Sequence, residues 1–133
     1  MRKTIEYTAV FVTGALGYGA VELLWRGFTH WTMILTGGVC LLCIYLNEMY
    51  NHSAPMWKRC LVGSLVISLS EITVGFVVNI LLDWAVWDYS TLPMNLFGQV
   101  CITYSLLWFL LCIPVTYLCT WLRRVLRTGS ENI

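Results

Sequence analysis

The residue in this sequence best suited to chemistry is Glu71, an acid near the middle of an apolar stretch at residues 60–82. Small residues recur beside it at helical spacing, at Ser64, Ser68 and Gly75. A charged carboxylate facing lipid at this depth costs about 2.5 kcal/mol or more, so Glu71 must face other helices, find a partner or stay protonated. Such an acid could exchange a proton, or it could be a structural hydrogen-bonding group between helices.

A second ionisable pair, Glu22 and Arg26, lies at the end of the first apolar stretch, residues 5–24. Together with Ala15 and Gly19 they recur at spacings of four, three and four residues, so all four share one helix face. An acid four residues before a base is the favourable order for an ion pair on a helix. The pair could bind a polar solute, or it could simply place both charges near the lipid headgroups.

Residues 87–99 join two long apolar stretches and concentrate aromatic and polar groups, namely Trp87, Asp88, Tyr89, Asn95 and Gln99. Aspartate accepts backbone N–H bonds in turns, and Trp and Tyr rings favour the membrane interface. We expect an ordered loop that covers the outer end of the helices; the alternative is an ordinary aromatic anchor. The pattern predicts that the last helix starts near Asn95, with the Asn95 and Gln99 amides on one face.

Two further polar residues are candidates for binding. Asn79 lies one helical turn beyond Gly75, and His30 lies in the short turn between the first two apolar stretches. His30 could carry a proton or hold a ligand, but a lone histidine there is also a common headgroup-level residue. The CxxC pair Cys40 and Cys43 has no second pair or histidine nearby in sequence, so packing explains it better than a metal. The pattern predicts no catalytic residue, metal site or cofactor.

Composition indicates which elements position these residues. Hydrophobic residues make up 59% of the 133 residues and charged residues 11%, against about 25% charged in soluble domains. The mean hydropathy is +0.73. Because a transmembrane helix needs about 20 apolar residues, the sequence predicts four spans, within residues 5–24, 31–47, 60–82 and 89–122. We expect an all-α integral membrane protein with four transmembrane helices, forming one domain over residues 1–133, in which the front of the last stretch is a loop.

Charge predicts the orientation in the lipid bilayer. Seven of the eight basic residues fall on one side of a four-pass topology, namely Arg2, Lys3, Lys58, Arg59, Arg123, Arg124 and Arg127. The positive-inside rule makes that side cytoplasmic, so we expect a multi-pass protein of the cell membrane with both termini inside. The formal net charge of +1 argues against a nucleic-acid partner.

The two halves of the sequence resemble each other. Glu22 corresponds to Glu71, and the pattern from Met33 to Leu41 corresponds to that from Met94 to Ile102. This predicts two repeated helical hairpins, about residues 5–50 and 58–122, in the same orientation around an axis along the membrane normal.

Taken together, the chain resembles the bacterial ABC-transporter type IV (CmpB-like) membrane protein family, whose members are also named ABC transporter permeases. The resemblance covers roughly residues 14–114. Its motifs in this sequence are Gly19-x-x-Glu22-x-x-Trp25-Arg26-Gly27-x-Thr29-His30-Trp31-x-Met33, Gly37-Gly38, Glu71-x-x-x-Gly75-x-x-x-Asn79, Val86-Trp87-Asp88-Tyr89-Ser90-x-x-Pro93-x-Asn95-x-x-Gly98-Gln99-x-Cys101 and Leu107-Trp108.

The resemblance implies a transport-related membrane protein rather than an enzyme. The sequence contains no G-x-x-x-x-G-K-[ST] nucleotide-binding loop, so any ATPase partner would be a separate subunit. We expect a permease-like subunit that binds a polar solute or a proton within its helix bundle, as a homo-oligomer or with another membrane subunit. The alternative is a structural or regulatory membrane subunit without transport activity.

Overall fold

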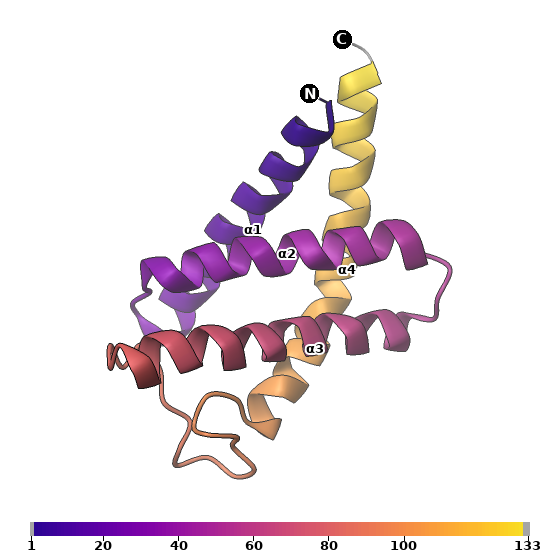
Figure 1. The fold of residues 1–133 in the computed structure, drawn as a ribbon. Coiled ribbons are helices and arrows are strands. Elements are labelled where there is room, and N and C mark those ends of the chain that lie inside the picture. The colour runs from indigo at the N-terminus through magenta and orange to yellow at the C-terminus, as the bar shows by residue number, and fades with distance from the viewer. Residues whose placement is uncertain (1, 132–133) are drawn as a thin grey trace.

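The fold is all-helical, as expected from the sequence. The computed structural model describes residues 2–131, and within that range it contains no strand, only an isolated β-bridge between Leu96 and Val100. The helices are α1 (Arg2–Arg26), α2 (Trp31–Asn51), α3 (Met56–Gly75), the π-helical segment η1 (Phe76–Leu81) that continues α3, and α4 (Ile102–Glu131) (Figure 1).

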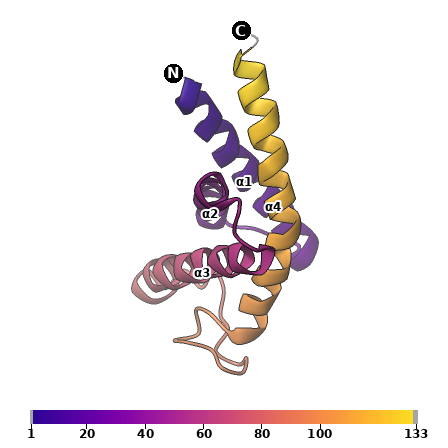
Figure 2. The same cartoon turned by 90° about the vertical axis from the view of Figure 1, so that its right-hand side faces the viewer.

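Four helices are each long and apolar enough to cross a membrane, with α3 and η1 together forming one span, Met56–Leu81. This confirms the predicted number of spans. The helices form one bundle in which α4 is steeply inclined to α2 and α3 in two perpendicular views (Figures 1 and 2). The crossing lets α4 contact α1, α2 and α3, so that all four helices meet around its middle.

Glycines allow α1 and α2 to pack closely. A Cβ atom built on Gly14 would lie 2.5 Å from the Leu41 Cβ and 2.7 Å from the Gly37 carbonyl oxygen. A Cβ on Gly38 would lie 2.9 Å from the Phe11 ring. The Gly37-Gly38 pair therefore permits the close backbone approach that small residues give in membrane helices.

The serine face of α3 packs against α4. The Ser64 hydroxyl donates to the Ser105 carbonyl oxygen at 2.8 Å, and the Ser68 and Ser105 hydroxyl oxygens are 2.9 Å apart. A Cβ on Gly63 would lie 2.5 Å from the Cys112 sulfur, so this glycine too marks a close contact. Because Glu71 shares the Ser64 and Ser68 face, this packing turns Glu71 towards α4.

The hydrophobic core lies where the helices meet, and cysteines serve in it as small packing residues. Its buried members are Val10, Leu41, Ile44, Tyr45, Cys60, Cys112, Cys119 and Leu122. At one edge of this core Glu6 accepts a hydrogen bond from the Tyr45 hydroxyl and forms an ion pair with Arg127 at 3.3 Å. These contacts hold the first turns of α1 and the last turns of α4 at the same end of the molecule (Figure 1).

The start of the last helix differs from the prediction. We expected it near Asn95, but residues 82–101 form a loop and α4 begins at Ile102. The reason is local backbone geometry: Phe97 and Gly98 have φ angles of 56° and 72°, which a right-handed α-helix cannot contain. The predicted shared helix face of Asn95 and Gln99 is therefore also wrong.

The two segments that suggested a repeat have different local structures. Residues 33–41 are helical within α2, whereas residues 94–101 belong to the 82–101 loop. The repeated hairpins therefore stay a prediction.

Candidate functional site

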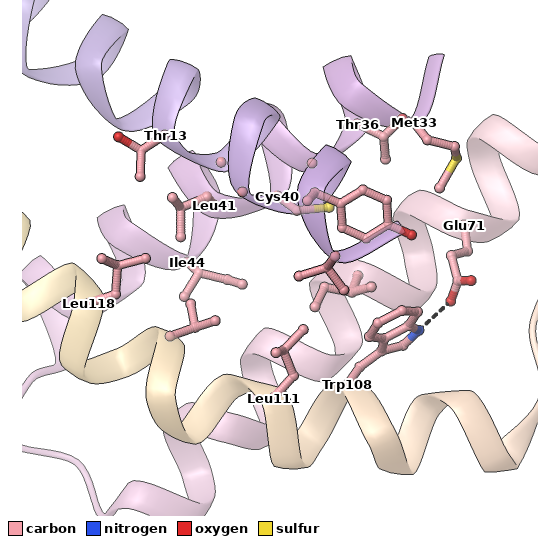
Figure 3. Close-up of a pocket in the computed structure, with 17 residues that line it drawn as sticks. Thr13, Met33, Thr36, Cys40, Leu41, Ile44, Glu71, Trp108, Leu111 and Leu118 are labelled. Carbon is pink, nitrogen blue, oxygen red and sulfur yellow. Dashed lines mark hydrogen bonds between the residues drawn. The ribbon is translucent and has the colours of Figure 1, made fainter. Parts of the chain in front are cut away.

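Glu71 is buried near the middle of the span formed by α3 and η1, and it is held by two uncharged donors. Its side chain is only 3% exposed. The Trp108 indole N–H, on α4, donates to its Oε1 at 2.8 Å (Figure 3). The Tyr89 hydroxyl, from the 82–101 loop, donates to its Oε2 at 2.9 Å. Glu71 thus joins three parts of the chain through hydrogen bonds rather than through an ion pair.

Aromatic rings surround this carboxyl group. Tyr89 stacks on Tyr104 with ring centroids 4.8 Å apart, and Tyr104 lies 6.2 Å from Trp108. Trp108 in turn lies 6.3 Å from Tyr18 on α1. Burial, together with the nearby Glu71 carboxylate, raises the pKa of Tyr89 far above its ordinary value, so its hydroxyl stays a hydrogen-bond donor.

The ion pair expected from sequence spacing is present on α1. The Arg26 Nε lies 3.2 Å from the Glu22 Oε2, and Glu22 is 5% exposed. Arg26 also donates from Nη2 to the Val86 carbonyl oxygen at 2.8 Å, and its guanidinium lies over the Phe28 ring at 4.4 Å. The Oε2 atom is buried and accepts no hydrogen bond within the described part of the chain, and the nearby charge of Arg26 compensates it.

Two adjoining cavities lie beside these acids. The first, of about 200 Å³, lies among the four helices and has Glu71 and Trp108 at one end (Figure 3). The second, of about 210 Å³, is lined by the Glu22–Arg26 pair and by aromatic rings. Both are lined by Tyr18 and Trp108, so the two spaces share a wall. A solute in either one would lie close to a carboxyl group.

The 82–101 loop folds back onto the end of the α3–η1 span. Asn79, on η1, forms hydrogen bonds with this loop. Asn79 Nδ2 donates to the Gln99 Oε1 at 2.8 Å, and Asn79 Oδ1 accepts from the Val86 N–H at 2.7 Å. The Trp87 indole, 6% exposed, donates to the Gln99 carbonyl oxygen at 2.9 Å. Gly75 makes room, since a Cβ there would lie 2.9 Å from the Trp87 ring. Asn79 lies on the π-helical segment η1, and π-helical insertions are frequent at functional sites.

Two of the predicted binding residues instead shape this loop. Asp88 is exposed, and the Ser90 N–H donates to its Oδ1 at 2.9 Å, which lowers the pKa of Asp88. Asn95 donates to the carbonyl oxygens of Ser90 and Leu92 and accepts from the Gly98 N–H at 3.0 Å. Neither residue lines either of the two cavities described above.

His30 caps the start of α2. Its Nδ1 accepts from the Thr32 N–H at 3.3 Å and lies 2.6 Å from the Thr32 hydroxyl oxygen. The ring lies 5.7 Å from both the Trp31 and the Trp84 rings, centroid to centroid. It lines neither cavity, so the geometry favours the interface role over the ligand role.

The structure therefore divides the ten predicted residues into three groups. Those that line the cavities are Glu22, Arg26, Glu71 and Tyr89. Those that hold the loop on the bundle are Asn79, Trp87 and Gln99. Those that form the loop or a helix cap are His30, Asp88 and Asn95.

Sequence reasoning missed four aromatic members of the site, Tyr18, Trp25, Tyr104 and Trp108. Tyr18 is close enough to both Glu22 and Glu71 to interact with their charges. Spacing offered a signal: Tyr18 precedes Glu22 by four residues, and Trp108 follows Tyr104 by four. The hydrogen bond between Trp108 and Glu71 depends on how α3 and α4 pack. Spacing within one helix does not predict this packing.

Metal coordination is not indicated among the described residues, where no group of three or more His, Cys, Asp or Glu side chains could hold an ion. No solved structure matches the chain. The sequence model of a family described as "Putative ABC-transporter type IV" matches residues 5–132. The match spans nearly the whole chain, so the protein belongs to this family. With its four apolar helices, it is a multi-pass, transporter-like membrane component.

Proposed function

We propose that this family member is a small transporter component, or permease-like subunit, that binds a proton or a polar solute at Glu71 within its helix bundle. The observation that carries the proposal is the setting of Glu71: a buried carboxyl group beside a cavity among four helices, whose hydrogen-bond partners among the described residues are neutral donors. The proposed role is binding, not catalysis, in keeping with the family.

Neutral donors suit a group that must change its state. A carboxylate locked in a buried ion pair resists protonation, because its basic partner would then be left as an uncompensated charge. The Trp108 indole and the Tyr89 hydroxyl carry no charge. Glu71 can therefore gain or lose a proton without leaving a charged partner uncompensated. The neighbouring Glu22–Arg26 pair supplies fixed charges at the second cavity.

The 82–101 loop fits the role of a gate on the outer side. Tyr89 is itself part of the loop and bonds directly to Glu71, so a movement of the loop would change the hydrogen bonding of the acid. Asn79 and Gln99 hold the loop closed through their paired amides.

We also propose the partners and the orientation. Many large apolar side chains on the described helices are exposed, among them Leu16, Leu24, Leu69 and Leu110, which suits contact with lipid and with a second copy or another membrane subunit. A separate ATPase would supply the energy, and both termini would lie in the cytoplasm, because the basic residues gather on that side.

A structural or regulatory subunit is the second candidate function, and the seating of Trp87 favours it. Trp87 is buried and anchored to the Gln99 carbonyl oxygen, as expected of a plug that closes the bundle. In that case Glu71 serves only to tie the loop to α3 and α4.

Proton movement into vesicles tests the first candidate against the second. Protein is reconstituted in liposomes that contain a pH-sensitive dye, and a pH difference is imposed across the membrane. We expect wild-type protein to speed the internal pH change and Glu71→Gln to abolish that effect, since Gln keeps the size of the side chain but cannot titrate. Glu6→Gln is the matched control, because Glu6 is an equally buried acid that lines neither cavity.

Two results would contradict the proposal. One is equal proton movement with wild-type and Glu71→Gln protein. The other is wild-type protein that never exceeds empty vesicles.

A further inference from the structure

Three charged side chains line the two cavities: Glu22, Arg26 and Glu71. Arg26 forms an ion pair with Glu22 through its Nε and donates a hydrogen bond from its Nη2 to the Val86 carbonyl oxygen. The lining therefore contains one basic and two acidic side chains. The charge of an ionised Glu71 is not balanced by any other side chain of the cavity lining. A solute bound here is favoured if it carries a positive charge.

Aromatic faces point to the kind of cation. Five rings line the second cavity, those of Tyr18, Trp25, Tyr89, Tyr104 and Trp108. The face of an aromatic ring attracts cations, and quaternary ammonium groups are commonly bound inside such clusters of rings. A hydrated inorganic ion needs several oxygen ligands, which this largely apolar lining does not supply.

The size and the polarity of the spaces limit the ligand further. Each cavity measures about 200 Å³, and the shared wall includes Val21 and Leu111 as well as Tyr18 and Trp108. We infer that the adjoining cavities bind a small, apolar organic cation of the alkylated ammonium type, with its charged group at the shared wall near Glu71, Tyr18 and Trp108 and its hydrocarbon against the remaining aromatic and aliphatic lining. This inference rests on the proposed function, because it requires Glu71 to be a binding residue.

A pair of molecules of nearly the same shape tests the role of charge. Benzyltrimethylammonium and neopentylbenzene differ in having nitrogen or carbon at one centre, so only the first is charged. Each is titrated into the purified full-length protein in an uncharged maltoside detergent, and tryptophan fluorescence is recorded, since Trp25 and Trp108 line the site. We expect the cation to bind at least about tenfold more tightly than its neutral counterpart.

Substitutions assign the effect to named residues. Glu71→Gln should bring the affinity for the cation down to that for the neutral molecule, whereas Glu6→Gln, outside both cavities, should leave it unchanged. Tyr104→Phe keeps the ring and should keep the affinity. Tyr104→Leu removes the ring that stacks on Tyr89 and should weaken binding about fivefold to tenfold.

The opposite results would overturn the inference: equal affinity for the charged and the neutral molecule, or unchanged cation binding in Glu71→Gln. Loss of binding in Tyr104→Phe as well as Tyr104→Leu would also count against it, since the ring face would not be the recognised feature. A monomeric phosphatidylcholine that displaces the cation at lower concentration would reassign the site to a lipid headgroup. Each variant is first checked for an unchanged thermal midpoint, so that loss of fold is not read as loss of binding.

The failure of this inference can be told apart from the failure of the proposed function. If benzyltrimethylammonium does not bind but vesicle proton movement still depends on Glu71, the proposed function stands and only the ligand class is wrong. If neither depends on Glu71, both are wrong.

Discussion

At the scale of single residues, the two acids of the site are stabilised in different ways. Glu22 has a charged partner in Arg26, and Glu71 has the neutral donors Trp108 and Tyr89. A buried ion pair holds its charge state firmly, whereas a hydrogen-bonded acid can change it. In the proposed function, Glu22 therefore keeps its charge and Glu71 changes its protonation state.

Removal of Arg26 tests the fixed pair. Arg26→Ala leaves the buried Glu22 carboxylate without its cation, and it also removes the bond to the Val86 carbonyl oxygen. We expect a loss of about 2 kcal/mol of stability, below the range for fully buried pairs because the Arg26 side chain is 25% exposed. Thermal unfolding in detergent should show a lower midpoint, and Glu22→Gln added to Arg26→Ala should partly restore it.

The control for this prediction is Arg124→Ala, which removes an exposed arginine and should change little. Additive losses in the Arg26→Ala, Glu22→Gln double variant, with no recovery, would mean that the two side chains do not stabilise each other.

Contacts between side chains could be predicted from the sequence where both side chains belong to the same helix. Spacing alone placed Glu22 beside Arg26 and put Ser64 and Ser68 on the face of Glu71, because a helix fixes which side chains are neighbours. The partners of Glu71 could not be found in this way. They come from α4 and from the 82–101 loop, and such contacts between distant segments depend on packing.

At the scale of elements, the 82–101 loop shows how local signals were overridden. Pro93 and Asn95 are typical of a helix start, yet the chain stays non-helical up to Cys101. In the folded chain Asn95 bonds loop carbonyls, and Gln99 bonds Asn79, so both amides are engaged by contacts that a helix would break. The preference of a short segment for the helical conformation is weak compared with several such contacts acting together.

A single methyl group should disturb the seating of the loop. Gly75→Ala places a Cβ against the Gln99 side chain and 2.9 Å from the Trp87 ring, so the loop must shift, at a cost of about 1–3 kcal/mol. Gly17→Ala is the matched control, because a Cβ there would meet nothing within 4 Å and alanine favours the helix. Thermal unfolding should show a lower midpoint for Gly75→Ala and an equal or higher one for Gly17→Ala; similar losses in both would contradict this picture.

The order of the loop itself is tested by proteolysis. Asn79 accepts from the Val86 N–H and donates to the Gln99 Oε1, so Asn79→Ala removes both hydrogen bonds, at a cost of about 1–3 kcal/mol. The folded wild-type protein should resist cutting between Asp83 and Pro93, and Asn79→Ala should be cut there faster. Rapid cutting of the wild-type protein at this place would show that the loop is not an ordered cover.

At the scale of the whole molecule, the number of spans followed from the sequence because hydropathy and length decide it. The steep crossing of α4 over α2 and α3 did not, since no pattern within one span encodes its angle to another (Figure 2). The ion pair of Glu6 with Arg127 holds the first turns of α1 near the last turns of α4, which agrees with an even number of spans, because such a chain has both termini on the same side of the membrane.

Cysteine labelling tests the orientation. A cysteine at Thr91, in the 82–101 loop, should react with a membrane-impermeant reagent added outside cells, and one at Ser53, between α2 and α3, should not. Both are compared with the parent protein, because it has six cysteines of its own. The reverse pattern of labelling would invert the topology.

The central claim is that Glu71 exchanges a proton, and infrared difference spectroscopy tests it without any assumed substrate, partner or driving force. Spectra of the purified protein are recorded between acidic and alkaline buffer, and the carboxyl C=O band is followed in wild-type protein, Glu71→Gln and the control Glu6→Gln. We predict that one component of this band is present in wild-type and Glu6→Gln protein and missing in Glu71→Gln, because the buried acid is hydrogen-bonded by the neutral donors Tyr89 and Trp108. An identical band in wild-type and Glu71→Gln protein would contradict the claim and leave Glu71 as a purely structural hydrogen-bonding residue.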